Sequence, residues 1–85
     1  MPYIGQLRRD EIIGGEYLKG LAPKTAGELN FVLTSVVLQY LHQTKPSYQM
    51  YNDAIGALEA AKLELYRRKV VPYEDEKRVI NGDVY

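Results

Sequence analysis

Five cationic and aromatic residues in the C-terminal half of the chain have the side chains needed to bind an anion. They are Tyr66, Arg67, Arg68, Lys69 and Tyr73. Guanidinium groups bind phosphate through paired hydrogen bonds, and tyrosine rings stack on nucleobases. We therefore predict that this Arg/Tyr cluster binds a small anionic, nucleotide-like ligand. The alternative is that its cations stabilise a helix end and pair with Glu64, Glu74 or Asp75.

Acidic residues are frequent, but their spacing does not predict a metal site. All-helical pyrophosphohydrolases hold Mg²⁺ with E-x-x-E and E-x-x-D pairs, which place both carboxylates on one helix face. Here Glu59 and Glu64 are separated by five positions and diverge around a helix, whereas Glu74, Asp75 and Glu76 are consecutive. We expect no metal and no other cofactor, and a metal-dependent nucleotide hydrolase is only a third hypothesis.

Residues suited to nucleophilic catalysis are scarce. The chain has no cysteine, and its one histidine, His42, lies near the end of a predicted helix. Neither a G-x-S-x-G elbow nor a P-loop occurs in the sequence. We predict no catalytic residue and a protein that is not an enzyme.

Length and charge limit the possible partners. A chain of 85 residues predicts a single domain, and a small core without disulfides favours a homo-oligomer. Eleven basic residues balance 11 acidic ones, so no net charge attracts nucleic acid or an anionic membrane. No apolar run approaches the roughly 18 residues of a membrane span, and the N-terminus does not resemble a signal peptide. We expect a cytoplasmic protein.

Two long helices are predicted, over residues 26–42 and 48–69. The first follows a T-x-x-E capping box, Thr25 to Glu28, and the second follows Ser47, a favourable N-cap. Apolar residues recur in both at three- and four-residue steps. The short connection predicts antiparallel packing. Because apolar residues cover more than one face of the first helix, we expect that helix to form the oligomer interface.

The two ends of the chain are predicted from turn-forming residues. A short N-terminal helix is expected over residues 8–19, ending at Gly20. Pro72 should end the second long helix and begin an extended tail over residues 72–85. Asn81-Gly82 suits the turn of a small β-hairpin, and a frayed terminus is the alternative. The predicted fold class is mainly α: an antiparallel helical hairpin, a short N-terminal helix and possibly this β-hairpin.

Several segments together resemble a small uncharacterised protein family of bacteriophages and prophages. They are the opening MPYI, the segments GELNFVLT, LEAAKLELYRRK and PYEDEK, and the terminus NGDVY. The resemblance covers most of the chain and is densest after position 58. It implies a phage accessory role in the host cytoplasm and transfers no catalytic or binding residue.

Two main hypotheses for function follow. In the first, the protein is a non-enzymatic phage accessory protein whose oligomer binds a small anionic ligand through the Arg/Tyr cluster. Sequestration of a nucleotide signal used in host defence is one such role, by analogy with other small phage binders. In the second, it is a protein-binding regulator or structural accessory, because surfaces rich in tyrosine and arginine suit protein interfaces.

Overall fold

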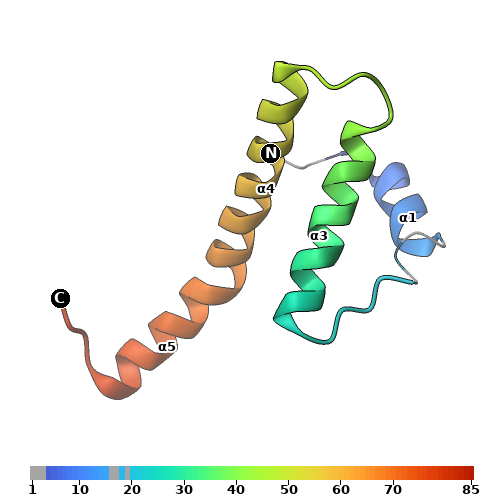
Figure 1. Cartoon of the computed structure of the whole chain (residues 1–85). Helices are drawn as coiled ribbons and strands as arrows, with labels where there is room; N and C mark the ends of the chain where they lie inside the picture. The colour runs from blue at the N-terminus through green and yellow to red at the C-terminus, as the bar shows by residue number, and fades with distance from the viewer. Residues whose placement is uncertain (1–3, 16–17, 19) are drawn as a thin grey trace. The chain divides into compact units, whose positions relative to one another are not determined.

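The computed structural model describes residues 4–15, 18 and 20–85, and this part of the chain is mainly α-helical (Figure 1). The elements in chain order are α1 (Gln6–Gly14), α3 (Ala26–Leu41), α4 (Tyr48–Leu65), the π-helical segment η1 (Tyr66–Val70) and α5 (Val71–Asn81). No strand occurs among the described residues. The predicted mainly α fold, with a short N-terminal helix and two long helices, is confirmed.

The described residues form two compact units, 4–54 and 55–85. The first unit contains α1, α3 and the start of α4, and the second contains the remainder of α4, η1 and α5. Within the first unit, the loop of residues 42–47 reverses the chain, so that α4 sets out in the direction opposite to α3 (Figure 1). One domain over the whole chain stays a prediction.

Both predicted N-caps are confirmed. Thr25 Oγ1 accepts a hydrogen bond of 3.1 Å from the backbone N–H of Glu28, and Ser47 Oγ accepts one of 3.2 Å from Met50. The carboxylate of Glu28 accepts the backbone N–H of Lys24 at 3.2 Å, one residue before the usual capping-box donor. These bonds satisfy N–H groups near the helix starts, so α3 and α4 begin where the sequence predicts.

The N-terminal helix is shorter than predicted. α1 ends at Gly14, and Gly15 is extended, with φ −88° and ψ 176°. Glycine destabilises a helix interior by about 1 kcal/mol relative to alanine, and two in succession end the helix here. The predicted continuation to residue 19 is therefore wrong at Gly15, and its residues 16, 17 and 19 lie outside the described part.

The predicted tail is wrong, because residues 71–81 are helical. Val71 keeps helical angles, φ −59° and ψ −48°, so the helix continues past Pro72. It ends at Asn81, where Gly82 has φ 88° and its N–H bonds to the carbonyl of Arg78 at 2.9 Å. A positive φ suits glycine in a helix stop as well as in a hairpin turn. Asn81-Gly82 is thus the end of a helix rather than a β-turn between strands.

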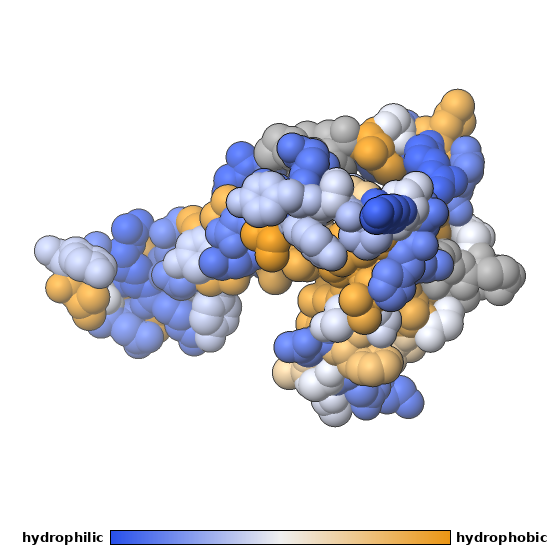
Figure 2. Space-filling view, turned by 45° about the horizontal axis from the view of Figure 1, so that its top comes forward, coloured by the Kyte–Doolittle hydropathy of each residue, from blue (hydrophilic) through white to orange (hydrophobic). Residues whose placement is uncertain are grey.

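Few apolar side chains are buried. Among the described residues the buried ones are Leu41 and Ala54, each 8% exposed. Hydrophobic residues reach the visible surface between hydrophilic ones (Figure 2), and Phe31 in α3 is 73% exposed. The single chain therefore leaves apolar surface available for a partner.

Candidate functional site

The Arg/Tyr cluster lies on a π-helical turn. The backbone N–H of Val71 bonds to the carbonyl of Tyr66, five residues back, instead of four. Pro72 explains this wider turn, because proline has no N–H to give to the carbonyl of Arg68 and its ring clashes with that carbonyl in a regular α-helix. A π turn inserts one extra residue and relieves the clash, and such turns are frequent at functional sites.

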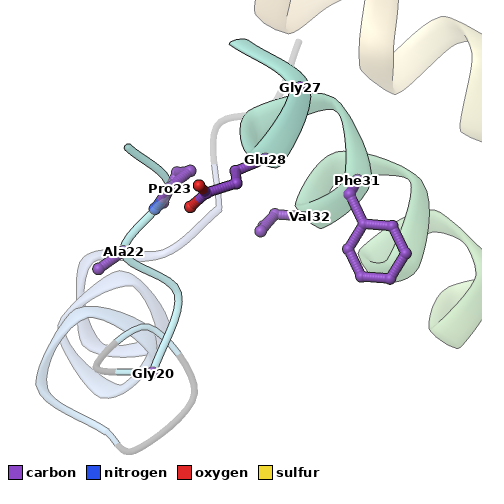
Figure 3. A pocket seen from close by; sticks show the side chains of 7 residues that line it. All are labelled: Gly20, Ala22, Pro23, Gly27, Glu28, Phe31 and Val32. Carbon is purple, nitrogen blue, oxygen red and sulfur yellow. The ribbon is translucent and has the colours of Figure 1, made fainter. Parts of the chain in front are cut away.

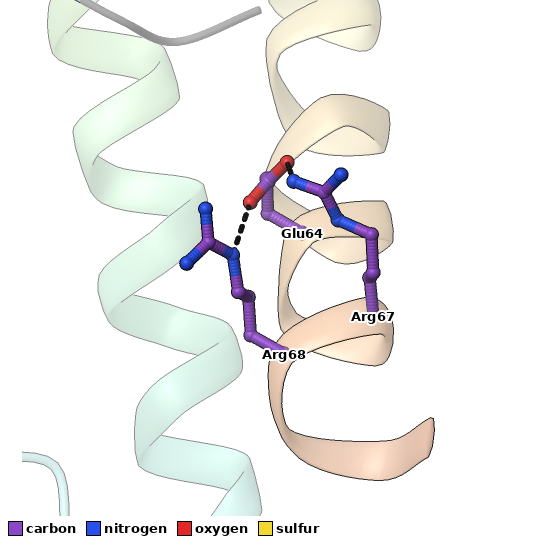
Figure 4. A network of polar contacts seen from close by, with 3 residues as sticks. All are labelled: Glu64, Arg67 and Arg68. Carbon is purple, nitrogen blue, oxygen red and sulfur yellow. Dashed lines mark hydrogen bonds and ion pairs between the residues drawn. The ribbon is translucent and has the colours of Figure 1, made fainter. Parts of the chain in front are cut away.

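The two arginines of the cluster share one carboxylate. Arg67 Nη2 lies 2.6 Å from Glu64 Oε1, and Arg68 Nε lies 3.3 Å from Glu64 Oε2. Figure 4 shows Glu64 between the two guanidinium groups, one oxygen facing each. The Glu64 side chain is 22% exposed, whereas those of Arg67 and Arg68 are 62% and 65% exposed. Glu64 thus orients two guanidinium groups that still face solvent.

The phenol of Tyr66 is held by Glu74. Tyr66 Oη donates a hydrogen bond of 3.1 Å to Glu74 Oε1, across the π turn. This hydrogen bond, followed by the negative charge of Glu74, raises the pKa of the Tyr66 phenol above its ordinary value of 10.0. The two residues are eight positions apart, a spacing that the extra residue of the π turn brings onto one face.

The remaining two members have different surroundings. Tyr73, 60% exposed, lies in the first turn of α5 with Lys77 Nζ 5.6 Å from its ring centre, within range of a cation–π interaction. Lys69 forms no ion pair with any described residue. Its ammonium group is therefore the one cation of the cluster that is not paired with a carboxylate among the described residues.

The structure therefore divides the predicted cluster into three contacts rather than one pocket. Glu64 pairs with both Arg67 and Arg68. This confirms the alternative prediction that cations of the cluster pair with Glu64. The predicted stabilisation of a helix end by residues 67–69 is wrong, because the helix continues to Asn81 and its last turn contains Arg78. The hydrogen bond between Tyr66 and Glu74 was not predicted from the sequence. Pro72 could have indicated it, because a proline inside a helix favours the π turn that brings the two residues onto one face. A binding role for the five residues stays a prediction.

Replacing Glu74 should lower the pKa of Tyr66. We expect Glu74→Gln to shift it towards 10, because glutamine keeps an acceptor but removes the charge. A raised phenol pKa stabilises the fold at neutral pH, and this contribution disappears as the pH rises through the raised pKa. The measurement is an alkaline titration of Tyr66 by ¹³C NMR of labelled tyrosine, because the chain has eight tyrosines.

Asp75→Asn is the matched control for that titration. It removes a neighbouring charge that pairs with Arg78 at 3.5 Å and does not bond to Tyr66. A Tyr66 pKa that is equal in the parent and in Glu74→Gln would contradict the assignment.

The described surface has several hollows, among them one of about 370 Å³ that is lined by residues of α1 and α3 and by Gln43. Another, of about 360 Å³, lies at the start of α3 (Figure 3) and is lined by Gly20, Ala22, Pro23, Gly27, Glu28, Phe31 and Val32. Its one charged group, Glu28, is already engaged by the backbone of Lys24. A third, of about 530 Å³, lies between α5 and residues 82–85 and includes Tyr73, Lys77 and Arg78. Among these hollows of the described residues, the one at α5 places cations beside a member of the Arg/Tyr cluster.

The described residues contain neither a metal-binding group of side chains nor a membrane-spanning helix. No group of three or more histidine, aspartate or glutamate side chains among them could hold a metal ion. Each helix in the described ranges is too short or too polar to span a lipid bilayer.

The sequence matches a known protein family. The model of a domain of unknown function, DUF6899, matches residues 1–84. The chain belongs to the DUF6899 family. No curated protein and no solved structure matches it. The match confirms the coarse resemblance to an uncharacterised family, whereas the phage or prophage origin stays a prediction. Because the DUF6899 description names no ligand, a binding role for this DUF6899 chain is argued from geometry.

Proposed function

We propose that this protein is a non-enzymatic accessory protein of a bacteriophage or prophage, whose oligomer binds a small anionic, nucleotide-like ligand. The observation that carries the proposal is the π-helical turn with its three consecutive cations, Arg67, Arg68 and Lys69. Sequestration of a nucleotide signal used in host defence is the role we propose for such binding, in the host cytoplasm.

The chemistry of the turn suits a phosphate group. Both guanidinium groups are more than half exposed and oriented by Glu64, so little side-chain freedom is lost when an anion binds. Lys69 adds a charge without a carboxylate partner, and Tyr66 and Tyr73 offer exposed rings for a base. A symmetric oligomer would bring copies of this turn together around one ligand.

Removing the arginines should abolish most of the binding. We expect Arg67→Ala and Arg68→Ala each to raise the Kd for a nucleotide or cyclic nucleotide at least tenfold, because charge-assisted hydrogen bonds contribute about 1.5–3 kcal/mol. The measurement is native mass spectrometry against a panel of nucleotides, followed by calorimetry on any that bind.

Arg8→Ala is the matched control. Arg8 pairs with Glu11 at 3.1 Å with the same three-residue spacing as Arg67 and Glu64, and its side chain is 66% exposed. Binding should survive in this variant. Unchanged binding in the Arg67 and Arg68 variants, or no binding by the parent to any member of the panel, would contradict the proposal.

A protein-binding regulator or structural accessory is the second candidate. It is favoured by the large apolar side chains that the described chain exposes, such as Phe31 at 73% and Val79 at 82%. Proteins that expose contiguous apolar surface commonly bind other proteins with it. A single stoichiometric protein partner, together with no ligand from the panel, would favour this candidate.

A further inference from the structure

An apolar face of α5 is exposed to solvent. Pro72, Tyr73, Val79 and Ile80 occupy this face, and the last three side chains are 60%, 82% and 64% exposed. Among the described residues, the element that contacts α5 is η1, which precedes it along the same helix. Apolar side chains exposed together on one face of a helix commonly mark a surface that binds a partner, so this face of α5 is a candidate interface.

A single carboxylate stands at the centre of this face. Glu76 lies three and four residues from Tyr73 and Pro72 on one side, and from Val79 and Ile80 on the other, so the helical period surrounds it with apolar residues. Its two acidic neighbours have partners within the chain, since Glu74 accepts from Tyr66 and Asp75 pairs with Arg78. Glu76 forms no ion pair with a described residue. The partner of α5 should therefore supply a cation here.

The order of charges along α5 is compatible with a second copy of the same helix as that partner. Acidic residues 74–76 are followed directly by the basic residues Lys77 and Arg78. A parallel pair of such helices would place like charges level with each other, whereas an antiparallel pair places acidic residues level with basic ones. The sequence of α5 is thus complementary to itself in the antiparallel direction, as a two-fold symmetric interface requires.

We propose that α5 is a self-association surface, on which α5 of a second copy of this chain packs antiparallel. In this register Tyr73 lies level with Ile80 of the second copy, and Glu76 lies level with Lys77 of the second copy. Two-fold symmetry makes each contact occur twice. Lys77 is placed for this role because its ammonium group already lies over the Tyr73 ring at the edge of the apolar face. This pairing covers Tyr73 and places the two copies of residues 66–70 at opposite ends of the helix pair, so it is a different contact from one that would gather the Arg/Tyr cluster around a ligand. It is therefore tested on the ligand-free protein.

Exchanging the two charges tests the interface. Sedimentation velocity over a range of protein concentrations should show a monomer–dimer equilibrium for the parent chain. Glu76→Lys and Lys77→Glu should each raise the dimer Kd at least tenfold, because each creates two pairs of like charges. The double variant restores opposite charges in exchanged positions and should associate nearly as well as the parent.

Glu59→Lys in α4 is the control for Glu76→Lys. It makes the same change in net charge at an exposed position outside α5. It should leave the dimer Kd unchanged. A parent chain that stays monomeric at millimolar concentration overturns the proposal. Equal association of the parent and the single variants overturns it as well, as does a double variant that fails to recover.

Disulfide trapping tests the register by a second route. The chain has no cysteine, so single substitutions give no background. A mixture of Tyr73→Cys and Ile80→Cys chains should form the mixed disulfide dimer in preference to either like pair. Random pairing of the two variants contradicts the proposed register.

Discussion

Leu41→Ala should lower the free energy of unfolding by about 2–5 kcal/mol, the usual cost of removing a buried leucine side chain. Leu41 is the last residue of α3 and is 8% exposed. Among the described residues, the other buried apolar residue is Ala54. A core this small contains few other contacts that could compensate for the cavity. Because small domains are stable by only about 5–15 kcal/mol, this substitution should remove a large share of the total. Urea denaturation followed by circular dichroism measures it.

Leu38→Ala is the matched control for this prediction. It removes the same atoms from the same helix, one turn earlier, but Leu38 is 46% exposed. We expect a loss well below that of Leu41→Ala. Equal losses in the two variants would mean that the exposed surface of α3 is covered in solution, as an oligomer interface through this helix requires. The oligomeric state of both variants should therefore be measured at the same concentrations.

Features that depend on near neighbours in the sequence could be predicted. The hydroxyls of Thr25 and Ser47 cap their helices because the N–H groups that they accept lie within the next three residues. The pairing of Glu64 with Arg68 follows in the same way from a four-residue spacing on a helix. These contacts need only the local helical geometry, which the apolar period indicates.

Features decided by competition between two local preferences could not be predicted. Asn81-Gly82 fits a hairpin turn and a helix end equally well, because both need a positive φ at glycine. The preceding acidic and basic residues form helices readily, and this preference prevails in α5. The contact of Tyr66 with Glu74 could not be predicted either, because a regular α-helix does not place residues eight positions apart on the same face.

Pro72→Ala should stabilise the helix and at the same time disrupt the candidate site. Alanine restores the N–H that can bond to the carbonyl of Arg68, and it removes the ring that clashes with that carbonyl. The π turn then has no reason to persist, and residues 66–71 should return to regular α-helical bonding. Proline costs about 3 kcal/mol relative to alanine inside a helix, so the expected gain in stability lies between zero and about 3 kcal/mol.

Loss of the π turn should rotate α5 relative to the residues that precede the turn. Removing one inserted residue changes the helical register by about 100°, the angle per residue of an α-helix. Glu74 then leaves the face of Tyr66, and the hydrogen bond of 3.1 Å between them should break. The pKa of Tyr66 should fall towards its ordinary value, as in Glu74→Gln, although Glu74 is still present. Ligand binding that depends on the arrangement of Tyr66, Tyr73 and the arginines should weaken as well.

Pro46→Ala separates this effect from the general consequence of removing a proline. Pro46 lies in the loop before α4, where a new N–H enters no helical bond, so we expect little change or a small loss of stability. Thermal unfolding and the NMR titration of Tyr66 should be measured on both variants and on the parent. A Pro72→Ala chain that is more stable and has an ordinary Tyr66 pKa would show that the π turn positions the site at a cost in stability. An unchanged Tyr66 pKa in Pro72→Ala would show that the wide turn persists without proline, and that side-chain contacts such as those of Glu64 maintain it.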